Sequence, residues 1–187
     1  MSQPLHEGFP VAPLSRARIR AAAVHARRIL ELPDGRINIP RLLDKLSQYG
    51  IHYDVFDQKS EPVPREVEAC YVPEDRTLYI RDTVHAEMEK GGNRSRFTFG
   101  HELGHAVLAH RRTLNRQSGS TIPIYCGSEW QANCFAAEFI MPLTEITKFN
   151  LYSVDAIAEH FGVSPAAAGF RLDDLTKKGN YSAPPSI

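Results

Sequence analysis

The clearest chemistry in this 187-residue sequence lies in the stretch His101-Glu102-Leu103-Gly104-His105. Side chains four positions apart share one face of an α-helix, so both imidazoles can reach the same small cation. Zinc suits such a pair because it accepts imidazole ligands in tetrahedral geometry. Glu102 stands one position along, beside the metal rather than on it, where it can take a proton from water. The spacing therefore predicts a zinc site equipped for hydrolysis.

A catalytic zinc needs a third protein ligand and an open fourth position for water. A histidine ten residues after His101 would complete one common arrangement, but position 111 is arginine. His110 follows His101 by nine residues, which is about 180° around an ideal helix. We therefore expect His110 to face away from the metal, as an ordinary surface or packing histidine.

The other common third ligand is a glutamate from a following helix, and the candidates there are Glu129 and Glu138. Asn133 comes one turn after Glu129 on the same face, where its amide can hydrogen-bond a metal ligand. Glu138 stands among alanines and a phenylalanine with no polar companion, so a solvated helix face is its simpler interpretation. We favour Glu129 as the third ligand and keep Glu138 as the alternative.

Hydrophobic periodicity and turn residues predict the elements that must hold these side chains. Helices are expected over residues 15–32, 40–49, 93–110 and 128–141, with two short helices between 154 and 177. Strands are expected over 51–56, 67–72 and 77–81, the last two forming a hairpin around residues 73–76. The predicted fold class is α+β, with a mainly helical core, a small antiparallel sheet and a C-terminal helical segment.

The bulk composition excludes several classes of protein. The 22 basic and 22 acidic side chains give a net charge of zero, so no chain-wide field attracts nucleic acid or anionic membrane. The three cysteines (positions 70, 126 and 134) suggest no disulfide framework and fit a reducing compartment. The apolar pattern leads us to expect neither a signal peptide nor a transmembrane helix, which needs a run of about 18 apolar residues. We expect a cytoplasmic protein without a membrane segment or a nucleic-acid partner.

Two blocks of this sequence resemble the ImmA/IrrE-like zinc metallopeptidase family. The first runs from Arg96 to His105, where Arg-Phe-Thr leads into the HExxH motif, and the second is the E-x-x-A-N-x-F-A-A pattern that begins at Glu129 and ends in Met141-Pro142. Position 100 is glycine where alanine is usual, and position 139 is phenylalanine where leucine is usual. The likeness covers roughly residues 35–175.

The resemblance implies a gluzincin-like zinc endopeptidase of narrow specificity. By position, His101, His105 and Glu129 would bind the metal and Glu102 would be the general base. Members of the family cleave helix-turn-helix repressors and thereby switch on the repressed genes, which implies a protein substrate here. The donor that stabilises the oxyanion stays open, with Tyr71 and Tyr125 as candidates.

We divide the chain into a flexible arm (1–13), a metallopeptidase domain (14–150), a helix-turn-helix-like segment (151–178) and a tail (179–187). The first helix carries five arginines, which we interpret as a solvated face; they are at positions 16, 18, 20, 27 and 28.

Two non-proteolytic alternatives stay open. The helix-turn-helix-like segment allows a DNA-binding regulator. Its second helix, however, carries Asp173 and Asp174 beside Arg171, whereas helices that read DNA are usually richer in basic and amide side chains. The other alternative is a protein that masks a repressor without cleaving it.

Overall fold

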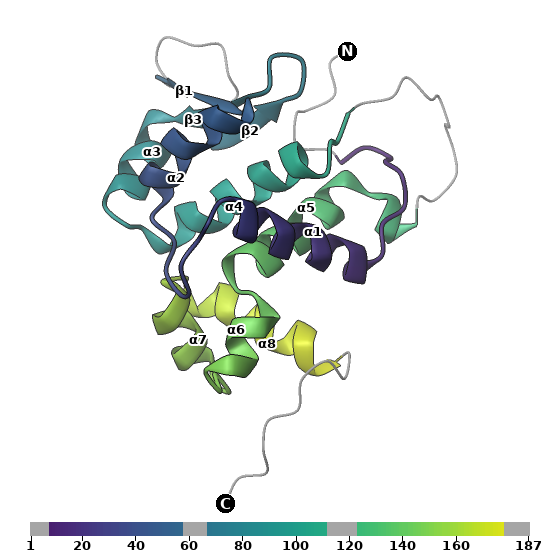
Figure 1. The fold of residues 1–187 in the computed structure, drawn as a ribbon, viewed down its shortest axis with the longest axis vertical. Coiled ribbons are helices and arrows are strands. Elements are labelled where there is room, and N and C mark those ends of the chain that lie inside the picture. Colours follow the sequence, from purple (N-terminus) through teal and green to yellow (C-terminus); the bar gives the residue numbers. More distant parts are fainter. Residues whose placement is uncertain (1–7, 58–66, 112–122, 178–187) are drawn as a thin grey trace, which may run out of the picture.

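The computed structural model describes residues 8–57, 67–111 and 123–177, and most of them are helical (Figure 1). The α-helices are α1 (Arg16–Ile29), α2 (Ile39–Leu46), α3 (Asp82–Glu89), α4 (Asn93–Val107), α5 (Ser128–Ile140), α6 (Leu143–Lys148), α7 (Val154–Phe161) and α8 (Pro165–Lys177). Short 3₁₀ turns, η1 (Ser47–Tyr49) and η2 (Ile124–Cys126), follow α2 and precede α5. Together with a three-stranded sheet, these helices confirm the α+β class.

Helices α4 and α5 form the central pair of the molecule, and α1 packs on α5 (Figure 1). Their interface is closed by fully buried side chains, among them Phe99 and Leu103 from α4 and Phe135 from α5. Gly104 lets the two backbones approach, since a Cβ atom there would lie 3.2 Å from the Cα atom of Ala132. This close approach brings the first turn of α5 to the face of α4 that carries the histidines.

The sheet lies against α4 and consists of β1 (His52–Phe56), β2 (Ala69–Val72) and β3 (Thr77–Arg81), in the order β1-β3-β2. The hairpin strands β2 and β3 are antiparallel, as expected, but β1 runs parallel to β3. The prediction of an antiparallel sheet is therefore wrong for β1. Alternation of apolar residues reports which face of a strand is buried and carries no information on the direction of its neighbour.

Two short helices were not expected from the sequence. Helix α3 begins at the residue after β3, without an intervening loop, and α6 begins directly after Pro142. They have eight and six residues, fewer than the 11 to 18 or so over which helical periodicity becomes distinct.

The expected pair of C-terminal helices is present as α7 and α8. Ser153 caps α7 by accepting a hydrogen bond from the backbone of Ala156, and Gly162 ends it in the left-handed conformation. Both helices contribute to the main hydrophobic core, α7 through Phe161 and α8 through Leu175. The C-terminal segment is thus packed on the domain that precedes it.

Arginines on α1 join this packing through ion pairs. Arg16 bonds Asp174 on α8 at 2.7 Å, Arg20 bonds Glu138 on α5 at 3.0 Å, and the buried Arg27 pairs with Glu145. The interpretation of the basic helix as a solvated face is therefore wrong for these three arginines, because periodicity cannot show which charges meet a partner from a distant segment.

No α-helix within the described residues is long and apolar enough to cross a membrane. Residues 1–7 of the expected arm, residues 112–122, which connect α4 to the segment before α5, and the expected tail lie outside the described residues.

Candidate metal centre

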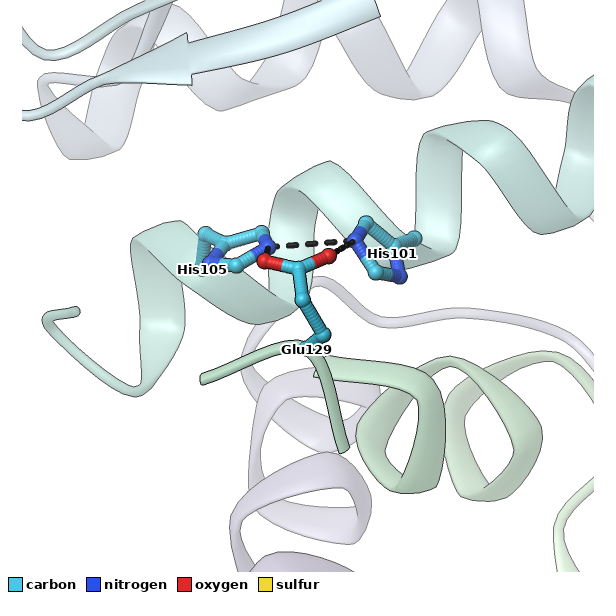
Figure 2. A group of neighbouring side chains, drawn as sticks. All are labelled: His101, His105 and Glu129. Carbon is cyan, nitrogen blue, oxygen red and sulfur yellow. Dashed lines mark hydrogen bonds and ion pairs between the residues drawn. The ribbon is translucent and has the colours of Figure 1, made fainter. Parts of the chain in front are cut away.

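The structure brings the two histidines of α4 and Glu129 of α5 together, and we call these three candidate metal ligands the metal triad (Figure 2). The Nε2 atom of His101 lies 3.1 Å from that of His105 and 3.1 Å from Oε2 of Glu129. The Nε2 atom of His105 lies 3.5 Å from Oε1 of Glu129. Ligand atoms at zinc–ligand distances of about 2.05 Å in a tetrahedron are separated by about 3.4 Å, so this donor set fits zinc.

The electrostatics of the triad also suit a cation. Burial alone lowers the pKa of His101, but Glu129 and Glu102 outweigh it and leave this pKa above its usual value. Burial and the neighbouring His101 lower the pKa of His105. Burial would raise the pKa of Glu129, but the histidines, His101 foremost, bring it below its ordinary value. Near neutral pH the triad therefore presents a carboxylate and a neutral imidazole, which are the ligand forms that bind metal.

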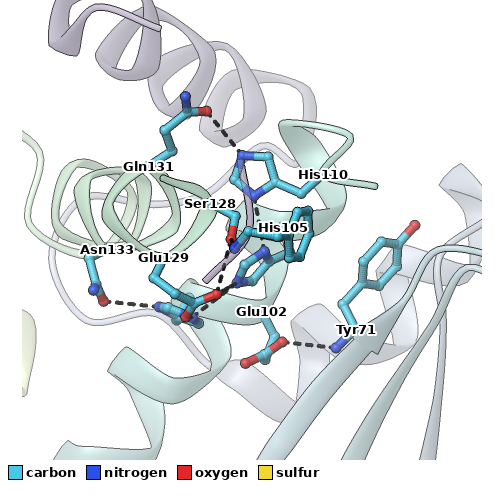
Figure 3. Close-up of polar contacts among 10 residues, drawn as sticks. Tyr71, Glu102, His105, His110, Ser128, Glu129, Gln131 and Asn133 are labelled. Atoms are coloured by element: carbon cyan, nitrogen blue, oxygen red, sulfur yellow. Dashed lines mark hydrogen bonds and ion pairs between the residues drawn. The ribbon is translucent and has the colours of Figure 1, made fainter. Parts of the chain in front are cut away.

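Glu102 lies beside the triad with its carboxyl group facing strand β2 (Figure 3). Its Oε2 atom accepts a hydrogen bond of 2.8 Å from the backbone N–H of Tyr71. Burial raises the pKa of Glu102 to about 7, although the neighbouring His101 and the Tyr71 N–H act in the opposite direction. A carboxyl group with this pKa can exchange a proton near neutral pH, as a general base must.

Neighbouring polar groups fix the orientation of the triad. The Nδ1 atom of His101 lies 2.9 Å from Oδ1 of Asn133, the residue that was expected on this face. Ser128 donates from its hydroxyl to Oε1 of Glu129 at 3.3 Å. Bonds of this kind hold a ligating imidazole in one tautomer and one ring orientation.

His110 does not face away from the metal site, contrary to the expectation from helical spacing. Helix α4 ends at Val107, and Ala109 adopts a left-handed conformation with φ of 52°. The backbone N–H of His110 then bonds the carbonyl of His105, which is the long-range bond of a Schellman-type helix end. This reversal brings Nδ1 of His110 to 2.9 Å from Nδ1 of His105, with only 3% of His110 exposed.

Glu138, the alternative ligand, lies away from the triad. It is 6% exposed and accepts two hydrogen bonds from the guanidinium of Arg171, at 3.0 and 2.7 Å, and one from Arg20. The expectation that Glu138 stands on a solvated face is wrong, because α8 and α1 cover that side of α5. The same contacts bury Arg171, so this side chain is not available to the groove of a DNA helix.

A pocket of about 290 Å³ opens over the triad and Glu102. One wall is the β2 segment from Ala69 to Pro73, and another is Phe9. Tyr71 thus lines the pocket, whereas Tyr125 is 49% exposed and outside its lining.

Residues 8–14 run along the segment before α5, although we expected residues up to 13 in a flexible arm. Phe9 and Ser128 exchange two hydrogen bonds, and the N–H of Val11 donates to the carbonyl of Cys126. Gly8 contacts Glu129 so closely that a Cβ atom would lie 2.8 Å from its Cγ atom. The sequence could not predict this position of residues 8–14, because pairing through a few backbone hydrogen bonds produces no periodic pattern of apolar side chains.

Two imidazoles one helical turn apart and a glutamate from a second helix are the ligand set of thermolysin-like zinc peptidases. Fold and site together therefore define a domain of metallopeptidase type. The chain belongs to the Peptidase M78 family: the model of the IrrE N-terminal-like domain matches residues 63–173, more than half of its length. The predicted family resemblance is thereby confirmed.

Among solved structures, the fold is similar to that of a Mycobacterium tuberculosis transcriptional regulator, with a TM-score of 0.56 and 18% sequence identity. The match covers 83% of this chain and 46% of the regulator, so the chain spans about half of the regulator's length. At this identity the likeness concerns the fold alone. Comparison with curated proteins gave no match.

Proposed function

We propose that this chain is a zinc-dependent endopeptidase in which His101, His105 and Glu129 hold the metal and Glu102 is the general base. The observation that carries the proposal is the convergence of three ligand atoms, all within 4.8 Å of one another, beside a fourth ionisable side chain. Membership in a peptidase family supports the same reaction class.

Each residue of the site has a definite task in this reaction. Zinc, when bound, supplies a Lewis acid that polarises water and the peptide carbonyl. Glu102 takes a proton from the attacking water and delivers it to the leaving amine. The Tyr71 N–H holds Oε2 of Glu102, so Oε1 is the oxygen left to carry that proton. Asn133 keeps His101 oriented toward the metal.

The substrate we propose is a cytoplasmic helix-turn-helix repressor, whose cleavage would release its genes. Among the described strands, β2 lies at an edge of the sheet and its residues line the pocket, and an extended segment of a protein can add to such an edge. A chain of zero net charge does not compete for operator DNA by charge. Destroying the repressor reaches the same regulatory result without contact with DNA.

The test is incubation of the zinc-loaded protein with the repressor encoded next to its gene, followed by gel analysis. The wild-type protein should cleave the repressor, and a chelator should stop the reaction. Glu102→Gln keeps the shape of the side chain but cannot accept the proton, so cleavage should slow by about 10²- to 10⁴-fold. Casein should stay intact if specificity is narrow. If the repressor stays intact, yet the wild-type protein and Glu102→Gln both release it from DNA, masking is the mechanism and the proposal fails.

A further inference from the structure

Two buried polar residues next to the metal triad have no part in the reaction described above. His110 is 3% exposed and Gln131 has no exposed surface. They form a chain of hydrogen bonds that starts at His105 (Figure 3): Nδ1 of His105 lies 2.9 Å from Nδ1 of His110, and Nε2 of His110 lies 3.0 Å from Oε1 of Gln131. The amide nitrogen of Gln131 donates to the carbonyls of Ala12 and Tyr125, both at 2.8 Å.

The far end of this chain fixes the direction of every bond in it. The two carbonyls can only accept, so the amide nitrogen of Gln131 faces them and its oxygen must accept from His110. His110 therefore carries its proton on Nε2, and as a neutral imidazole it accepts at Nδ1. The proton in the remaining bond then belongs to Nδ1 of His105. Consequently, Nε2 of His105 keeps a free lone pair on the side of the metal triad.

A protonated His110 would reverse the bond to His105, but its surroundings disfavour that form. Both of its hydrogen-bond partners, an imidazole and an amide, are neutral groups. A cation buried between two neutral hydrogen-bond partners loses its hydration, and that loss opposes protonation of the ring. The neutral ring and the bond directions above are therefore the consistent solution.

We propose that His110 and Gln131 are positioning residues that hold His105 in the Nδ1–H tautomer, with Nε2 directed at the metal. This inference rests on the proposed function for the identity of the metal ligand. His110 is not itself a ligand, because it contacts the ring nitrogen of His105 that points away from the triad. The left-handed Ala109 is what returns His110 to this place after the helix has ended.

The tautomers can be observed directly in the metal-free protein. Long-range ¹H–¹⁵N NMR spectra, recorded at a pH where both rings are neutral, should show the proton of His105 on Nδ1 and that of His110 on Nε2. A His105 proton on Nε2 would overturn the proposal. If the tautomers are as expected but the protein binds no zinc, the positioning chain stands and the proposed function fails.

Zinc affinity, measured by competition with a chelating dye, tests what the chain of bonds contributes. His110→Phe and Gln131→Leu should each weaken binding by about 10- to 100-fold, the usual effect of losing a partner of a ligating histidine. His110→Asn places an amide oxygen near the position of Nδ1 and should restore most of the affinity. His160→Phe is the control, because His160 packs between Phe149 and Phe161, away from the triad.

Circular dichroism of the metal-free variants separates loss of folding from loss of positioning. The proposal predicts folded His110→Phe and Gln131→Leu proteins with weak zinc binding. Folded variants that bind zinc as tightly as His160→Phe would overturn it, as would equal affinities of His110→Asn and His110→Phe. If one variant does not fold, the other variant and the NMR measurement still decide.

Discussion

Helix α5 carries two glutamates nine residues apart, on opposite sides, and their surroundings differ in kind. Glu138 faces the guanidinium groups of Arg171 and Arg20, which satisfy its charge within the protein. Glu129 instead faces two imidazoles whose lone pairs converge with its own oxygens. A carboxylate that already has arginine partners stabilises the fold, whereas one that lies among imidazole nitrogens provides a site for a cation from solution.

The largest expected effects are on the free energy of unfolding and on zinc binding, and they distinguish Glu138 from Glu129. Glu138→Gln leaves the buried Arg171 without a full counter-charge and should lower the free energy of unfolding by about 3–5 kcal/mol, with zinc binding retained. Glu129→Gln should do the reverse: zinc binding is lost, and metal-free stability changes by less than about 1 kcal/mol. Denaturant unfolding with a chelator present and zinc titration measure the two quantities. Equal losses of stability would remove the distinction between the two sides of α5.

The spacing of α4 and α5 is the next point to test. A methyl group on Gly104 meets the backbone of Ala132, so Gly104→Ala should cost about 1–3 kcal/mol and weaken zinc binding by moving Glu129. Gly100→Ala is the matched control, since its nearest neighbour is a side-chain atom of Ile140, 3.1 Å away. There the gain in helix propensity, about 0.5–1 kcal/mol, should offset the tighter packing. If both variants behave alike in unfolding and zinc titration, the close approach at Gly104 does not determine the position of Glu129.

The smallest effect concerns the end of α4. Ala109 has a positive φ, which glycine adopts without the strain of a Cβ atom. Ala109→Gly should therefore raise the free energy of unfolding slightly, by about 0.5 kcal/mol, and leave zinc affinity unchanged. A clear loss of stability would show that the left-handed residue is not strained in the protein.

The elements that carry the site were predictable because their signals are local. The His101–His105 spacing defines one helix face, and the long helix after residue 128 has a regular apolar pattern. What the sequence could not give depends on distant contacts. The ion pairs of Glu138 need α8 and α1, and the parallel direction of β1 needs the position of β3.

His110 shows the limit of helical spacing as an argument. Nine residues place it opposite His101 only if the helix continues, and α4 stops two residues after His105. A left-handed alanine at position 109 cannot be anticipated from residue type, because glycine or asparagine usually fills such a site. The hydrogen bonds from His105 through His110 to Gln131 could not be predicted either, because they depend on this helix end.

Elemental analysis of the purified protein tests the central claim most directly. The wild-type protein should bind about one zinc ion per chain. His101→Ala should lose most of the metal, whereas His25→Ala, which changes an exposed histidine on α1, should keep it. Full zinc occupancy in the His101→Ala protein would contradict the assignment of His101, His105 and Glu129 as the metal ligands.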